Sequence, residues 1–255
     1  MMLADYQFSF NGVTAGPGTP YRILSIDGLR TMPNLVSSDQ PRLRRSGVFA
    51  NGDSLSSRLL TISLMVSGTS VADFETNLTA LETALVPVRP GQFAAPFLFK
   101  QPGQNQRRFV AARPRKNASP QMPTYGRLWH KMNLQLVCPD PAQLDDVLTT
   151  TVIGSTGTIV NVGNLESYPV ITLTPSGGAV GIVNTANNCV LVLTGAIPSP
   201  CIVDTGSMTV VDGAGANRFD VVHLSAGMFP FLSPGSNPLT VSGASSSWAW
   251  RSAWV

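Results

Sequence analysis

One segment has the residue types of a catalytic motif, Val203-Asp204-Thr205-Gly206-Ser207. Aspartic proteases present a carboxylate in such a turn, and their chemistry needs two carboxylates that share one proton. A single-motif chain would have to dimerise and would need a downstream apolar-apolar-Gly strand, which 221–223 and 238–241 do not supply. We favour the alternative, a β-hairpin with Asp-Thr-Gly as its turn, because Asp and Gly are standard turn residues.

Other catalytic and ligand-binding patterns are missing from the sequence. His130 and His223 lack metal-binding partners three or four residues away, whereas a zinc site needs three or four ligands. The three cysteines, Cys138, Cys189 and Cys201, show no C-x-x-C spacing. No Walker loop or G-x-S-x-G motif is present. We therefore expect no catalytic residue, no cofactor site and no metal site, and thus no enzyme.

Arginines form two clusters in the first half of the chain. The members are Arg42, Arg44 and Arg45 in one cluster and Arg107, Arg108, Arg113 and Arg115, followed by Lys116, in the other. Clustered Arg and Lys bind phosphates, so the second cluster leaves a nucleic-acid site open. No known nucleic-acid module surrounds it, and Arg is favoured at protein interfaces, so we expect these arginines to contact neighbouring chains.

Tryptophans gather at the end of the sequence. Strand alternation places Trp248, Trp250 and Trp254 on one face of a last strand over 247–254. Such a row could stack on sugars, which makes a carbohydrate-binding module the alternative function. We favour a core or interface role, with Trp250 and Trp254 as interface candidates, because large aromatics dominate both settings.

Charge is scarce, at 12% of the 255 residues and a net charge of +3. Residues 151–255 carry only six charged side chains. A small soluble protein normally carries more, so this half is either covered by uncharged polar residues or covered in a permanent assembly. No apolar run reaches the roughly 18 residues needed to span a bilayer, and the first residues show no signal peptide, so we expect no membrane insertion.

Alternation and turn residues predict a mainly β protein with two domains. In residues 1–145 we expect a strand at 21–28, a broken strand or loop at 31–52, a strand at 58–66, and strands at 96–100, 107–112 and 128–137. Ser70, three residues before Asp73, predicts the start of a helix that ends at Leu85 before Pro87. Residues 101–125 form a basic hairpin and loop, and 140–157 a linker. Short apolar runs from 158 onward, 8–12 residues apart, predict a β-sandwich in residues 146–255.

The order of these features resembles the distal tail proteins of long, non-contractile-tailed bacteriophages. The resemblance lies in Ile26-Asp27-Gly28-Leu29, Pro41-Arg42, Gly47-Val48-Phe49, the strand from Ser57-Arg58, the helix 71–85, the segment 134–141, Tyr168-Pro169-Val170-Ile171, Ile202-Val203-Asp204-Thr205, 231–237 and Trp250-Arg251-Ser252-Ala253-Trp254. It spans nearly the whole chain. Two features of the family are not evident: a long belt hairpin at 101–125 and a carbohydrate-binding insertion.

The resemblance implies a structural virion protein with a galectin-like C-terminal sandwich. Its first domain would form a homohexameric ring at the distal end of the tail, and DNA would pass through the lumen during ejection. The implied partners are further copies of the chain, the tail tube protein, a tail-tip hub or tail-associated protein, and the tape measure protein. Assembly would take place in the host cytoplasm. Because DNA must slide through, we expect few arginines on the lumen wall.

Overall fold

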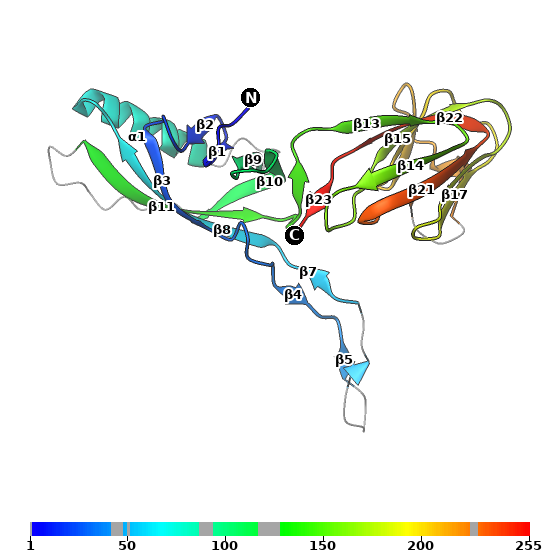
Figure 1. The fold of residues 1–255 in the computed structure, drawn as a ribbon, viewed down its shortest axis with the longest axis horizontal. Helices are drawn as coiled ribbons and strands as arrows, with labels where there is room; N and C mark the ends of the chain where they lie inside the picture. Colours follow the sequence, from blue (N-terminus) through cyan, green and yellow to red (C-terminus); the bar gives the residue numbers. More distant parts are fainter. Residues whose placement is uncertain (1, 42–47, 50–51, 87–93, 117–127, 225–228) are drawn as a thin grey trace. The chain divides into compact units, whose positions relative to one another are not determined.

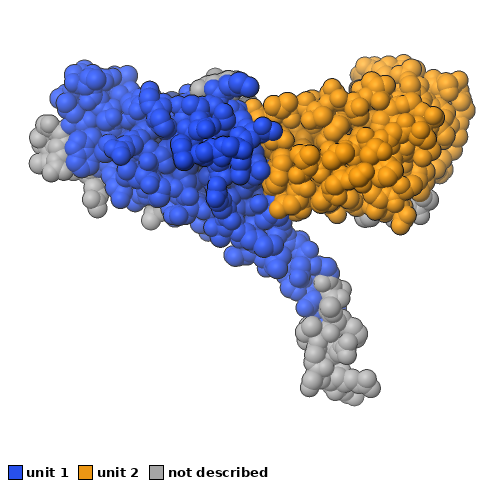
Figure 2. Space-filling model, viewed as in Figure 1, with its two compact units in different colours: residues 1–143, 255 blue, residues 144–254 orange. Residues whose placement is uncertain are grey.

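The computed structural model describes residues 2–41, 48–49, 52–86, 94–116, 128–224 and 229–255. The fold is mainly β, with 53% of residues in strands, which confirms the predicted fold class. The chain forms two compact units, residues 1–143 with Val255 (unit 1) and residues 144–254 (unit 2) (Figures 1 and 2). The sequence-based division at 145/146 stays a prediction.

Unit 1 is built on an antiparallel sheet that folds around one core. Its strands are β1 (Gln7–Phe10), β2 (Val13–Ala15), β3 (Tyr21–Asp27), β8 (Arg58–Ser67), β9 (Ala95–Lys100), β10 (Arg107–Lys116) and β11 (Trp129–Cys138). Their order is β2-β1-β9-β10-β11-β8-β3. The first part of β10 pairs with β9 and the part from Arg113 pairs with β11, so β10 belongs to both halves of the sheet. The apolar faces of both halves enclose a single cluster of buried side chains.

Strict alternation in β8 explains why this strand lies at the centre of unit 1. Leu60, Ile62, Leu64 and Val66 are fully buried, whereas the residues between them are partly exposed. β11 alternates in the same way and pairs with β8 along its full length. On the other side of the core, phenylalanines from β1, β9 and β10 stack, with ring centroids 5.1 Å apart for Phe8–Phe97 and 5.6 Å for Phe99–Phe109.

The predicted helix is confirmed as α1 (Val71–Leu85). The Ser70 hydroxyl accepts a hydrogen bond from the Asp73 amide, and the Asp73 carboxylate accepts from the Thr69 amide, which satisfies two free N–H groups at the helix start. Phe74, Leu81 and Leu85 point into the core of unit 1. Asn11 donates to the Ala84 carbonyl and so ties the end of the helix to the β1–β2 turn.

The described residues of the range 35–55, which are 35–41, 48–49 and 52–55, belong to an arm that extends away from the sheet of unit 1 (Figure 1). β4 (Leu35–Val36) pairs with β7 (Ser54–Leu55), and β5 (Gln40–Pro41) pairs with β6 (Val48–Phe49). Every residue from Asn34 to Gln40 is exposed. This hairpin replaces the predicted broken strand or loop at 31–52. Prolines and glycines broke the alternation in the sequence, but they permit two short ladders separated by irregular backbone.

Unit 2 is a β-sandwich of two five-stranded antiparallel sheets, ordered β13-β22-β15-β18-β19 and β14-β21-β16-β17-β20. The strands are β13 (Thr149–Ile153), β14 (Thr156–Asn161), β15 (Val170–Pro175), β16 (Val180–Asn184), β17 (Cys189–Leu193), β18 (Cys201–Asp204), β19 (Thr209–Asp212), β20 (Val222–Leu224), β21 (Gly235–Ser242) and β22 (Ala244–Trp250). Inward residues of both sheets share one buried cluster that contains Trp248, Ile171 and Leu191.

Three parts of the sequence-based prediction were wrong in detail. Residues 140–157 contain β12 (Gln143–Asp145), β13 and the start of β14 rather than a linker. Residues 113–124 are predicted as a loop or an extended arm; 113–116 continue strand β10, and 117–124 lie outside the described residues. The last strand is interrupted, because β22 ends at Trp250 and a separate β23 (Ala253–Trp254) follows. The linker was predicted at 140–157 because the strands there are polar or rich in threonine and lack a clear apolar alternation.

Candidate assembly interface

The Asp204 motif is a hairpin turn. Asp204 ends β18, and its Oδ1 accepts hydrogen bonds from the backbone amides of Gly206 and Ser207, both at 3.0 Å. β18 then pairs with β19 across the turn. The carboxylate is thus used to hold the backbone of the turn, as the preferred interpretation predicted.

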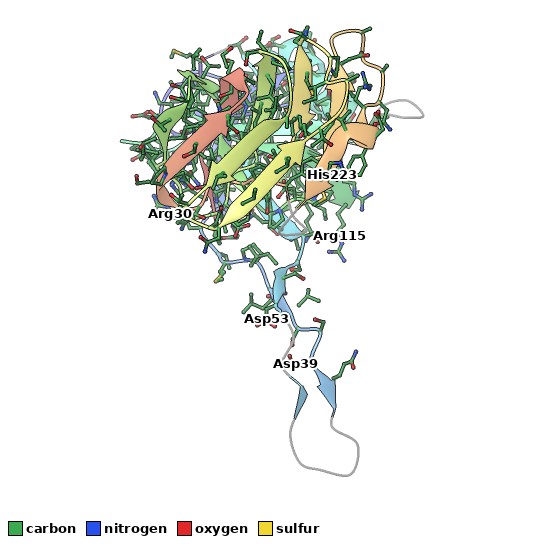
Figure 3. All side chains as sticks on the ribbon, turned by 90° about the vertical axis from the view of Figure 1, so that its right-hand side faces the viewer. Arg30, Asp39, Asp53, Arg115 and His223 are labelled. Carbon is green, nitrogen blue, oxygen red and sulfur yellow. The ribbon has the colours of Figure 1, made fainter. Side chains whose placement is uncertain are left out.

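Histidines and cysteines do not come together. His130 is buried in unit 1, His223 lies exposed on β20 of unit 2 (Figure 3), and the described residues contain no group of three or more His, Cys, Asp or Glu that could hold a metal ion. All three cysteines are buried free thiols. Burial raises the pKa of Cys138 to about 12, so this thiol stays neutral at physiological pH.

The second arginine cluster is spread along β10 rather than gathered in one patch. Arg113 and Arg115 are exposed on the part of β10 that pairs with β11, whereas Arg107 and Arg108 are half-buried. Arg107 donates to the Gln143 side chain at 3.2 Å. The assignment of these four arginines to an interface stays a prediction. Arg42, Arg44 and Arg45 lie outside the described residues.

The tryptophans do not form a surface row. Trp248 is 0% exposed and Trp250 is 6% exposed, and both belong to the core of unit 2. Trp248 Nε1 donates to the Ser246 hydroxyl, which satisfies its only polar group. Trp250 is therefore corrected from an interface residue to a core residue. Trp254 lies half-buried on β23, and its interface role stays a prediction. With two of three rings in the core, a sugar-stacking platform on this strand is not present.

A polar sheet face is the first surface of unit 1 suited to assembly. On the side of β8 and β11 opposite to the core lie Thr61, Ser63, Asn133 and Gln135, and the Ser63 hydroxyl lies 2.6 Å from Asn133 Oδ1. Ser63 also pairs with Ser25 on β3. The centre of this face is thus polar and uncharged. Charged side chains occur toward its ends.

Those end charges follow from the register. Arg22 and Lys131 flank Met65 in one row of the face, and Arg113 follows Val137 and Leu59 in another. The face therefore carries cations near both ends of its strands. Between them lie hydroxyl and amide groups and one carboxylate, Asp27, which pairs with Thr61. Such a surface can contact water or a passing polyanion without binding it tightly, because tight phosphate binding needs clustered cations.

The arm is the second surface. Leu35 and Val36 are 58% and 50% exposed, and the carboxylates of Asp39 and Asp53 lie along the arm (Figure 3). A two-stranded hairpin in water is marginally stable by itself, so an arm of this kind is expected to gain stability against another surface. The sequence signal that could have found it is the pair of short apolar runs Leu35-Val36 and Val48-Phe49, which are separated by polar and basic residues.

A groove of about 710 Å³ is the third surface of unit 1, and the sequence did not predict it. Its lining includes apolar residues of β3 and β9, among them Ile26 and Phe99, and three cations, Arg22, Arg30 and Lys100. Arg30 donates to the Gln101 side chain, and Lys100 pairs with Asp5 at 3.3 Å. The groove thus combines apolar walls with cations of which two, Arg30 and Lys100, are already bound by neighbours, which suits contact with a protein better than chemistry on a small substrate.

Comparison with protein-family models finds no match, and neither does comparison with curated proteins. Solved structures do match. The Dit (gp 19.1) protein of phage SPP1, described as a paradigm of the hub adsorption apparatus in phages infecting Gram-positive bacteria, is 17% identical, with a TM-score of 0.72 over 98% of this chain and 99% of that chain. A chain of the phage p2 baseplate in its activated conformation with Sr is 10% identical, with a TM-score of 0.52 over 96% of this chain and 97% of that one.

The same p2 baseplate with Ca gives the same values. These likenesses extend over both units and over nearly the whole length of each matched chain. The expected resemblance to phage distal tail proteins is therefore confirmed at the level of the fold, and the chain has the fold of the SPP1 Dit protein and of the phage p2 baseplate chain.

Proposed function

We propose that this chain is a structural virion protein of a long, non-contractile phage tail. It forms a homohexameric ring at the distal end of the tail and joins the tail tube to the tail-tip hub and receptor-binding apparatus. The observation that carries this proposal is the likeness to SPP1 Dit over 98% of the chain, in both units. The protein has a mechanical role, and neither the Asp204 turn nor the separated histidines offers a catalytic group.

In this proposal the polar face of β3, β8 and β11 lines the lumen of the ring. Its centre carries Ser25, Ser63 and Asn133 and no cation. DNA that passes through a lumen must not be held by the wall, and counterion release makes each added phosphate contact costly to break. Few arginines were expected there, and the cations of this face lie toward the strand ends.

The arm at residues 35–55 serves as the belt hairpin by which neighbouring subunits clasp one another. The family's belt hairpin was not evident at 101–125, and β9 and β10 are joined there only by a short turn. Within the described part of unit 1, the strands β4, β5 and β7 of this arm extend away from the sheet (Figure 1). Its exposed Leu35 and Val36 supply apolar surface that a neighbour can cover.

Unit 2 contacts other tail components in this proposal. Its outward sheet faces carry few charges, in keeping with the six charged side chains of residues 151–255. Charge-poor surfaces are typical of interface centres. The partners are the tail tube protein, a tail-tip hub or tail-associated protein, and the tape measure protein. The protein assembles in the host cytoplasm and ends up in the virion, with DNA a partner only in transit. Among the described residues, no helix is long and apolar enough to cross a membrane.

A charge insertion on the lumen face tests the proposal. The double variant Ser63→Lys, Asn133→Lys would place twelve new cations on the wall of a six-membered ring. Virions that carry it should assemble but eject DNA more slowly. The matched control is Thr158→Lys, Thr240→Lys, at exposed positions on β14 and β21. Ejection that is equally slow in both variants, or unchanged in the lumen variant, would contradict the placement of this face.

A further inference from the structure

One buried cation in unit 1 has no part in the proposal so far. Arg58 is the first residue of β8 and only 2% exposed. Its guanidinium donates to the carbonyl oxygens of Gly28 at 2.7 Å, Thr31 at 2.7 Å and Leu29 at 3.2 Å. A fourth bond goes to the Pro141 carbonyl at 3.1 Å. The ring of Phe109 lies below the group, 5.6 Å from the guanidinium carbon.

The four acceptors belong to segments that need an anchor. Gly28, Leu29 and Thr31 lie between the end of β3 and the first strand of the arm, and Arg58 itself follows the last strand of the arm. The single side chain therefore holds the outgoing base of the arm against the returning base. Pro141 lies just before the end of unit 1, so the same side chain also holds the segment that leads toward residue 143.

The neighbouring backbone is shaped for this contact. Gly28 has a φ of 97°, and a Cβ at this position would lie 2.1 Å from the Leu59 carbonyl oxygen. Only glycine allows this approach of the arm base to β8. Gln143 adds a second tie, because its Nε2 donates to the Leu29 carbonyl at 2.5 Å while its Oε1 accepts from Arg107.

The chemistry of the pocket excludes an ordinary ion pair. Among the described residues, no carboxylate lies within salt-bridge distance of Arg58. Its register partner on β11 is Cys138, whose thiol is neutral. A buried charge held by carbonyls alone is expensive. The guanidinium reaches these carbonyls through two of its nitrogens: Nη1 is shared among the three carbonyls of 28–31, and Nε donates to Pro141. Among the described residues, the buried Nη2 makes no hydrogen bond. Its donors thus tie together backbone segments that are distant in the sequence, which an apolar side chain could not do.

We infer that Arg58 is a positioning residue, which fixes the direction of the 35–55 arm by binding both sides of its base and the 139–143 segment. The role of the arm in clasping a neighbour rests on the proposed function, but the anchoring of the arm does not. Removing the guanidinium should leave the sheet of unit 1 folded and free the arm to swing about residues 28–34 and 56–57. Lysine should restore only part of the anchoring, because its ammonium has three donors and no planar fork.

A distance measurement between the arm and the body of unit 1 tests this inference. Spin labels are attached to Ser37→Cys on the arm and Thr79→Cys on α1, both exposed positions, while the three native cysteines are buried. The full chain is measured at dilutions at which it is monomeric. The chain with Arg58 should give one narrow distance distribution, Arg58→Met should lose that narrow peak, and Arg58→Lys should fall between them.

The control separates anchoring from general loss of stability. Leu60→Ala removes a fully buried side chain two residues along the same strand and should lower the melting temperature, yet it should keep the narrow distribution. The inference is overturned if Arg58→Met and Arg58→Lys both keep the narrow peak, or if Leu60→Ala broadens the distribution as much as they do. Failure of the chain with Arg58 to form rings at high concentration would overturn the proposed function, while the distance result would stand.

Discussion

Unit 1 and unit 2 each bury polar side chains that bind backbone carbonyls at or beyond the ends of strands, but they use different groups. In unit 1 the group is the Arg58 guanidinium, which binds four carbonyls in two separate segments. In unit 2 it is the Asn237 amide, which is 0% exposed. Asn237, near the start of β21, donates to the Ser233 and Gly235 carbonyls and accepts from the Ser233 amide. Its side-chain oxygen also accepts from the Asn184 amide on β16.

The difference follows from what each unit must hold. An amide both donates and accepts and carries no charge, so it can bind donors and acceptors of its surroundings at once. A guanidinium only donates and carries a charge, so it is suited to gathering carbonyls of separate segments at one point. Unit 2 therefore distributes its anchoring over several uncharged amides, such as Asn161, Asn184 and Asn237, whereas unit 1 concentrates the anchoring of its projecting arm in one charged residue.

The largest expected effect comes from removing the anchor of unit 1. Arg58→Ala should lower the free energy of unfolding of unit 1 by about 3–5 kcal/mol, because buried carbonyls lose their donors and the packed side-chain stem is lost. Urea denaturation, with hydrogen exchange to assign the transition to unit 1, measures it. A loss below about 1 kcal/mol would mean that water binds the carbonyls in place of the guanidinium. That result would contradict the proposed difference between the two units.

The anchor of unit 2 should matter less and only locally. Asn237→Ala removes the acceptor of the Ser233 amide and one of the two acceptors of the Asn184 amide, and we expect a loss of about 2–3 kcal/mol in unit 2 alone. Thr240→Ala, at an exposed position on the same strand, is the control and should change the stability little. Faster hydrogen exchange in unit 1 of the Asn237→Ala variant would contradict the expectation that this residue stabilises unit 2 alone.

The exposed hydrogen bonds of Asp73 at the start of α1 should contribute a smaller stabilisation of unit 1, and this contribution should depend on pH. Donation from the Thr69 amide and hydroxyl lowers the pKa of Asp73 below its ordinary value. A lowered pKa in the folded state means that the contribution to stability is present above the unfolded-state pKa and disappears as the pH falls through the folded-state pKa. Asp73→Asn should therefore lower the melting temperature at pH 7, and the difference from the unaltered chain should shrink below about pH 4. A constant difference across that range would contradict this origin.

The smallest effect is expected at the exposed turn of unit 2. Asp204→Asn keeps an oxygen that can accept from Gly206 and Ser207, so the stability should change by less than about 0.5 kcal/mol and assembly should be unchanged. Native mass spectrometry and thermal melting measure both. If the Asp204→Asn variant were stable but its virions failed to mature, that result would support a catalytic role for the carboxylate.

Regular elements could be predicted from the sequence because each is encoded locally. Alternation in Arg58–Val66 predicted β8, and Ser70 with Asp73 predicted the start of α1. The turn at Asp204 followed from residue type. The ordered series of short motifs also pointed to the fold that the comparison with solved structures found.

The rest depends on contacts between distant residues. Arg58 was placed in a strand but not recognised as an anchor, because its acceptors are backbone groups at 28–31 and 141 that carry no signal in the sequence. Trp250 could not be assigned to core or interface by alternation alone, since a sandwich strand has one face toward each. The arm was missed because its ladders have only two residues on each side.

The mass of the assembled protein tests the central claim most directly. Mass photometry across a concentration series, with negative-stain images of the heaviest species, should show six times the 27.0 kDa of one chain and ring-shaped particles with a central hole. A chain that stays monomeric at micromolar and higher concentrations, and that forms no ring when its tail partners are added, would contradict the account.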